Sequence, residues 1–131
     1  MKPGTVLKDG YIFVSDVIDP KTQKVYGLAV APKNESKMMS WRKANKLTLP
    51  NRMEMLVMYE HKDKIPRLTT LYWSSTESSN GTAWIQRFSD GYQGSYFKTN
   101  TLFVRCIRRI KYDVMRLELI LDMEKKIKKV K

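Results

Sequence analysis

Few residues of this chain could carry out catalysis. Its 131 residues include one cysteine, Cys106, and one histidine, His61, so a nucleophilic Cys–His pair depends on that single combination. One cysteine also excludes an internal disulfide and any zinc or iron–sulfur site built from several cysteines. His61 stands among charged residues at an expected helix end, which favours a solvated surface role. Cys106 falls in the middle of an expected strand, where a free thiol is typically a small, inert core residue.

Metal and phosphate chemistry find no support in the sequence either. Calcium needs about six or more oxygen ligands, several of them clustered carboxylates. No acidic cluster occurs between Trp73 and Arg109. No glycine-rich phosphate loop, Ser-His-Asp order or paired-carboxylate pattern stands out. Glu54 is better explained as a helix-capping residue than as a catalyst. We therefore predict that the protein is not an enzyme and uses no cofactor and no metal.

The composition is that of a small, folded, basic protein. The length suits one domain, and a hydrophobic content of 42% is too high for a disordered chain. The chain carries 25 basic and 13 acidic residues, a net charge of +12, and residues 98–131 hold 11 basic and 4 acidic residues, a net charge of +7. Such an excess attracts nucleic acid, anionic lipid or an acidic protein, or forms a solvated basic face.

The sequence also bears on where the protein acts. No apolar run approaches the roughly 20 residues of a membrane span. The N-terminal residues lack the apolar stretch of a secretion signal. We therefore expect synthesis in a host cytoplasm. Action outside a cell would then require lysis, a dedicated secretion route or incorporation into a virus particle.

Turn signals and apolar periodicity indicate the elements that position these residues. Strand-forming runs predict an N-terminal hairpin and a later antiparallel meander, at residues 11–14, 25–30, 71–75, 83–88, 92–98 and 102–108. Two short helices are expected between them. One begins after Ser40, and the other begins at Asn51 with Glu54 in capping-box position. The second helix should stop near residues 62–64, before Pro66.

The C-terminal segment reads differently from the rest. Residues 111–131 are predicted to form a basic amphipathic helix, separate from a domain at residues 1–110. Its apolar stripe either packs on its own domain or docks onto another chain. The candidate docking residues are Val114, Leu117, Ile120, Leu121, Lys125 and Lys126.

Several motifs follow one another in an order that resembles a known family. They are Leu49-Pro50-x-x-x-Glu54-Met55, Tyr72-Trp73-Ser74-Ser75-Thr76-Glu77, Ala83-Trp84 with Phe88 and Gly91, and Val104-Arg105-Cys106-Ile107-Arg108. This order resembles the C-type-lectin-like domains of bacterial and phage proteins, typified by the C-terminal domain of a collagen-like adhesin. More distant relatives are the variable proteins of diversity-generating retroelements and the formylglycine-generating enzymes. The resemblance spans residues 41–109.

The resemblance implies an α+β fold of the C-type-lectin-like kind. It predicts a twisted antiparallel sheet, two short helices and chain ends brought together in a hairpin, to which the C-terminal helix is added. Trp73 and Ser74 would then sit at the edge of the core, with Trp84 and Phe88 on the following strand, and core packing is the structural role expected of these aromatics. Arg105 and Arg108 should pair with a carboxylate or with strand-end carbonyls. The cysteine-based activity of the formylglycine-generating relatives does not carry over, and the calcium-binding motifs of animal lectins do not occur here.

The resemblance also implies a function in binding. The variable second half of the fold would display a ligand-binding surface, although its polar residues also suit ordinary turns and edge strands. The candidates are Ser78, Ser79, Asn80, Gln93, Ser95, Tyr96, Lys98 and Asn100.

We expect a phage virion component, as a capsid decoration, head-fibre or tail-associated protein. Its partners would be copies of itself in a cyclic homo-oligomer, other virion subunits, and a host-surface protein or glycan. The alternatives are a basic nucleic-acid-binding protein and a bacterial surface adhesin domain, which would need an export signal.

Overall fold

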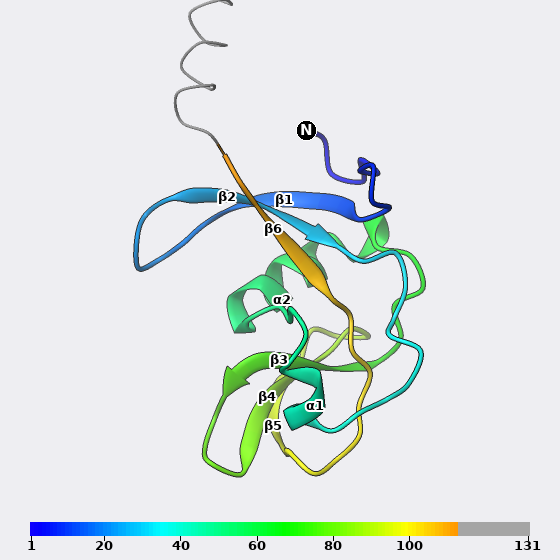
Figure 1. Ribbon diagram of the computed structural model, residues 1–131, viewed down its shortest axis with the longest axis vertical. Helices are drawn as coiled ribbons and strands as arrows, with labels where there is room; N and C mark the ends of the chain where they lie inside the picture. The colour runs from blue at the N-terminus through cyan, green and yellow to red at the C-terminus, as the bar shows by residue number, and fades with distance from the viewer. Residues whose placement is uncertain (113–131) are drawn as a thin grey trace, which may run out of the picture.

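Two small antiparallel sheets enclose a central helix in this protein (Figure 1). The structure is a computed structural model that describes residues 1–112. Its class is α+β, as predicted, but the expected single sheet is two sheets of three strands each. The elements in chain order are β1 (Ile12–Ile18), β2 (Val25–Val30), α1 (Trp41–Ala44), α2 (Arg52–Glu60), the 3₁₀ turn η1 (Lys62–Lys64), β3 (Leu71–Glu77), β4 (Thr82–Arg87), β5 (Gln93–Phe97) and β6 (Ile107–Lys111).

The first sheet has the order β1-β2-β6. The predicted N-terminal hairpin is present, with Ile12 opposite Val30 and a register shift between Phe13 and Ser15. The last described strand, β6, pairs antiparallel with β2 and not with β1. The two ends of the domain therefore share one sheet with β2 between them, whereas the resemblance implied that they pair as a hairpin.

The second sheet is a meander in the order β3-β4-β5, whereas the predicted meander comprised the runs 83–88, 92–98 and 102–108. The fourth predicted run, residues 102–108, is not a strand of this meander. Leu102 and Phe103 form isolated bridges, and the chain then crosses to the first sheet as β6. A loop provides the backbone partners of the crossing segment, since Glu35 N donates to Val104 O at 2.9 Å and Ala31 N donates to Cys106 O at 2.9 Å. These partners explain why strand-forming residues here do not extend the sheet.

Both predicted helices are present. Asn51 caps α2 as expected, because its side chain accepts from Glu54 N at 2.8 Å while the Glu54 carboxylate accepts from Asn51 N at 2.9 Å. The helix ends at Glu60, and residues 62–64 form the 3₁₀ turn η1. Ser40 precedes α1 but makes no side-chain cap bond. Among the described residues, no helix is long and apolar enough to span a membrane.

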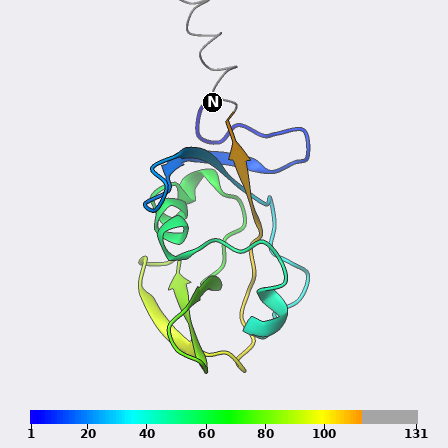
Figure 2. The same cartoon turned by 60° about the vertical axis from the view of Figure 1, so that its left-hand side comes forward.

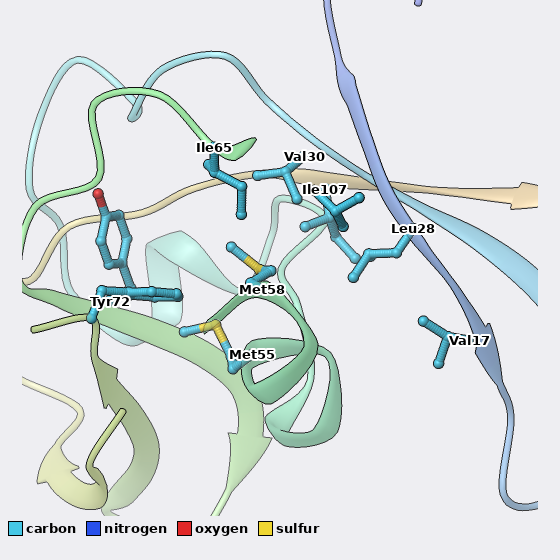
Figure 3. Close-up of a cluster of buried hydrophobic side chains, with 10 residues drawn as sticks. Val17, Leu28, Val30, Met55, Met58, Ile65, Tyr72 and Ile107 are labelled. Carbon is cyan, nitrogen blue, oxygen red and sulfur yellow. The ribbon is translucent and has the colours of Figure 1, made fainter. Parts of the chain in front are cut away.

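The core consists of two apolar clusters. Met55 and Met58 of α2 project between Tyr72 of β3 and the apolar face of the first sheet (Figure 3). The second cluster gathers around Trp73 and Trp41, beneath α1. Tyr72 and Trp73 are adjacent in β3 and point into different clusters, so the second sheet is packed on both faces. Position Trp73 is therefore deep in the core and not at its edge.

Candidate functional site

A buried carboxylate joins α2 to the first sheet. Glu54 has no exposed surface, and its carboxylate accepts two bonds from the Arg109 guanidinium of β6, at 2.6 and 2.8 Å. Tyr26 of β2 donates to the same carboxylate at 2.7 Å. Burial, followed by the hydrogen bond to Glu54, raises the pKa of Tyr26, and the hydrogen bond to Glu54 raises the pKa of Arg109. Glu54 is thus a cap, as predicted, and also an ionic link between the helix and the sheet.

Arg105 stabilises the crossing segment from inside the protein. Its guanidinium is buried and donates to the carbonyls of Ala31 at 2.8 Å, Pro66 at 3.0 Å and Arg67 at 2.9 Å. Its Nε also donates to Asn34 Oδ1 at 2.9 Å. The prediction that Arg105 pairs with carbonyls is confirmed. Arg108 pairs instead with a carboxylate, that of Asp9, at 2.8 Å on the surface.

The two residues considered for nucleophilic chemistry are hydrogen-bonded to different partners. Cys106 lies just before β6 and not within a strand; it is buried, and its thiol donates to Glu35 at 3.2 Å. Burial and that hydrogen bond raise the pKa of Cys106 to about 12, so the thiol stays protonated at neutral pH. His61 follows α2, half-buried, with Nδ1 at 2.9 Å from Val57 O. The Cys106 thiol and the His61 imidazole are therefore not hydrogen-bonded to each other in this structure.

The predicted ligand residues begin in the β3–β4 turn, where the two serines bond to other residues at that turn. Ser78 and Ser79 both contact the Thr82 hydroxyl, with Ser78 Oγ at 2.7 Å. Lys98, after β5, is buried and ties this turn to the second sheet. Its ammonium donates to Glu77 at 2.6 Å and to Asn80 O at 2.7 Å. Lys98 therefore holds the turn in place and is not an exposed ligand contact, in contrast to the expectation from the sequence.

A second polar network joins β5 to the start of α2. Gln93 Nε2 donates to Arg52 O and to Gln86 Oε1, both at 2.9 Å, while Arg52 Nε donates to Gln93 Oε1 at 2.8 Å. The Arg52 guanidinium lies 3.5 Å from the centre of the Trp84 ring. Gln93 is consequently saturated within the protein, and it orients an exposed arginine on a tryptophan face.

These contacts define an exposed strip on one face of the second sheet. Strand register sets Thr82 opposite Phe97 and Trp84 opposite Ser95, so their side chains share that face. Phe97 is 69% exposed, Ser95 is exposed, and Trp84 is half-buried. We call the group of residues Thr82, Trp84, Ser95, Phe97 and Arg52 the outer strip.

Of the residues in the outer strip, only Ser95 was predicted from the sequence to bind a ligand. Trp84 was assigned to the core, yet it lies on the opposite face from its buried neighbours Ala83 and Ile85. The alternation along this strand could have revealed its position, because successive side chains point to opposite faces. The same alternation in β5 places Phe97 outward, while Tyr96 packs against the second cluster.

The remaining predicted residues lie close to this strip or beyond the described part. Asn80 and Asn100 are exposed and lie in turns at one end of the second sheet. The Asn80 carbonyl accepts from the Lys98 ammonium, and Asn100 N donates to Phe97 O. The docking residues Val114, Leu117, Ile120, Leu121, Lys125 and Lys126 lie outside the described residues.

One surface cavity is present elsewhere on the molecule. It has a volume of about 440 Å³ and lies between η1 and Phe88, with Lys62 and Ile65 in its lining. The predicted ligand residues all lie elsewhere. Within residues 1–112, no three His, Cys, Asp or Glu side chains are grouped as metal ligands would be.

With this geometry established, the chain was compared with known proteins. No protein-family model matches it, and no curated protein matches it either.

Proposed function

We propose that the protein is a non-enzymatic binding module with a C-type-lectin-like fold, carried on a phage particle as a capsid decoration, head-fibre or tail-associated protein. The outer strip and the turns beside it would recognise a protein or glycan of the host surface. The observation that carries the proposal is an exposed aromatic and guanidinium surface on a sheet whose buried polar groups are bonded within the protein.

The arrangement of the chain supports this assignment of fold. A hairpin, two helices and a meander follow one another in the order that the residue patterns predict, and that order is compatible with the resemblance. Residues of the motifs that carry the resemblance also stabilise the fold. Glu54 of the Leu-Pro motif bonds to Arg109, directly after the final motif, and Trp73 fills the second cluster. The first contact fixes α2 on the first sheet, and the second fills the core beneath the second sheet.

The chemistry of the outer strip suits recognition. Tryptophan and arginine are the residue types most enriched at binding hot spots, and tyrosine and serine are favoured in antibody paratopes. Arg52 is held on Trp84 by Gln93, so it loses little conformational freedom when a ligand binds. A planar ring or an apolar side chain could stack beside Phe97 while polar groups bond to Ser95 and the turn.

Binding can be tested with intact cells of the host strain as the probe. Fluorescently labelled chain should bind them, and Phe97→Ser should weaken binding by about tenfold or more, since a hot-spot aromatic contributes roughly 2 kcal/mol. Ile18→Ser is the matched control, because Ile18 is also an exposed apolar strand residue, 57% exposed, but lies in β1. Equal binding by all three proteins would contradict the proposal, as would cell binding by an unrelated basic protein at the same level.

A second candidate function, nucleic-acid binding, is favoured by one surface segment. Residues 32–47, which run from the loop before α1 to just after it, carry five exposed basic side chains and a single acid, Glu35. None of these five pairs with a carboxylate inside the described part of the chain. They are Lys33, Lys37, Arg42, Lys43 and Lys46.

A salt titration with a DNA duplex and a single strand tests this second candidate. Binding through phosphates must weaken steeply as salt rises. Replacing Arg42 and Lys43 by alanine should then lower the salt dependence by about two ion equivalents. Replacing Lys21 and Lys24, in the β1–β2 turn, is the control with the same charge change. No binding at low salt would exclude this candidate.

A further inference from the structure

The strand β5 has a free edge. It pairs only with β4 within residues 1–112, and it lies at the margin of the molecule, coloured yellow in Figure 2. Arg87 N donates to Tyr92 O at 2.8 Å and Lys98 N donates to Gly81 O at 2.9 Å. Because backbone groups alternate in direction along a strand, the intervening residues Gly94 and Tyr96 also face β4.

The residues of β5 that alternate with Gly94 and Tyr96 point their backbone N–H and C=O groups away from β4. They are Gln93, Ser95 and Phe97, and of their outward groups only Phe97 O has a backbone partner in the described part, Asn100 N at 3.0 Å. Ser95 is exposed at the middle of this row. The edge thus offers a short ladder of unused donors and acceptors.

Nothing in β5 blocks pairing with another strand. Natural edge strands are protected by prolines, charged side chains, bulges or covering segments. The strand Gln93–Phe97 contains no proline and no charge, and its register with β4 is unbroken. The charged residues at its two ends are paired within the chain, Arg87 with Asp90 at 2.7 Å and Lys98 with Glu77 at 2.6 Å. In a chain of net charge +12, the strand itself is therefore neutral, and the nearby Arg52 guanidinium, which donates to Gln93, lies over Trp84 on the sheet face and not along the edge.

We propose that a second copy of this chain pairs with this edge, β5 against β5 and antiparallel, with Ser95 at the two-fold axis. In that register Ser95 faces Ser95 of the partner, and Gln93 faces Phe97 of the partner. Each outward N–H then meets an outward carbonyl, because all the facing residues have the same alternation. Phe97 O already accepts from Asn100 N, and it would accept the partner's Gln93 N–H through its second lone pair. The two copies join their meanders into one continuous sheet.

The local neutrality favours a second copy as the occupant. Two chains of charge +12 repel each other, and the repulsion is weakest where no unpaired charge lies on the shared edge. An isologous contact also needs a surface that is complementary to itself, which an antiparallel strand centred on one residue provides. The pairing uses the strand edge and leaves the sheet faces open. It therefore sets two outer strips side by side, and a ligand with repeated groups would bind both with increased avidity.

The test is the mass of the full chain in solution. Sedimentation equilibrium from about 10 µM to about 1 mM covers the affinity expected of a small interface. The wild-type mass should rise to a multiple of 15.4 kDa, and Ser95→Lys should halve the mass of the assembly by setting two ammonium groups at the axis. Ser36→Lys adds the same charge at another exposed serine and should leave the mass unchanged.

Thermal unfolding of both variants verifies that they are folded. A wild-type chain that is monomeric at the highest concentration would overturn the proposal, and so would an assembly that Ser95→Lys leaves intact. The register is tested by Ser95→Cys with a short bifunctional thiol crosslinker, because Ser95 faces its copy in a hydrogen-bonded pair whose Cβ atoms lie farther apart than a disulfide prefers. The reagent should give a covalent dimer, with Ser36→Cys as the control. An assembly that forms no such crosslink would overturn the proposed pairing. A monomeric chain that still binds host cells would refute this inference alone and leave the proposed function in place.

Discussion

At the scale of single residues, Glu54 both caps α2 and links this helix to the first sheet. A buried carboxylate must be paired and hydrogen-bonded to offset its desolvation, and here Arg109, Tyr26 and the Asn51 amide supply the partners. The side chain of Arg109 is 39% exposed, so the pair is buried on the carboxylate side only. Loss of the arginine would leave the carboxylate buried without its counter-ion.

Replacing Arg109 by alanine should therefore lower the free energy of unfolding by at least about 2 kcal/mol. The change is measured by urea denaturation. Arg108→Ala is the matched control, because Arg108 pairs with Asp9 on the surface, and it should change stability by less than about 1 kcal/mol. Equal effects of the two substitutions would contradict the role assigned to Glu54.

The thiol of Cys106 should be nearly inert in the folded protein. Burial raises its pKa to about 12, so the nucleophilic thiolate is scarce up to about pH 10. Reaction with a disulfide reagent should be slow in buffer and fast in denaturant. The thiol is more protonated in the folded state, so its contribution to stability is complete below about pH 8.5 and is lost as pH rises towards 12. Rapid labelling at pH 8 in buffer would show that the thiol is accessible.

At the scale of elements, the segment that crosses between the sheets depends on Arg105. This guanidinium binds carbonyls from two loops that are distant in sequence, at Ala31 and at Pro66 and Arg67. Arg105→Lys keeps the charge but cannot reproduce the planar fork of donors. We expect it to lower the free energy of unfolding by about 2–3 kcal/mol, since some buried carbonyls lose their donor. Arg42→Lys, on the surface of α1, is the control and should have little effect on denaturation.

Some of these elements could be predicted from the sequence, and others could not. The cap at Asn51 and the pairing of β4 with β5 were predictable, because capping and tight turns are encoded over a few residues. The crossing at residues 102–106 was not, since its residues favour a strand and only distant loop partners redirect it. The link from Glu54 to Arg109 spans 55 residues and has no local signal. Lys98 was misassigned for the same reason, because its partners Glu77 and Asn80 come from another turn.

At the scale of the whole molecule, charge is distributed unevenly over the described residues. The basic segment 32–47 runs from the loop before α1 to just after it. The outer strip lies on β4 and β5 and is mainly aromatic and uncharged apart from Arg52 of α2. A protein mounted on a particle needs one surface for attachment and another for recognition. The separation of these two kinds of surface is what we expect of such a protein.

The most direct test of the central claim is hydroxyl-radical footprinting of intact purified particles, read by mass spectrometry. We expect peptides of this chain in the particles, with Trp84 and Phe97 oxidised as readily as in the free protein, because the outer strip should face solvent. Protection of Trp84 and Phe97 in the particle, or particles that contain no peptide of this chain, would contradict the account.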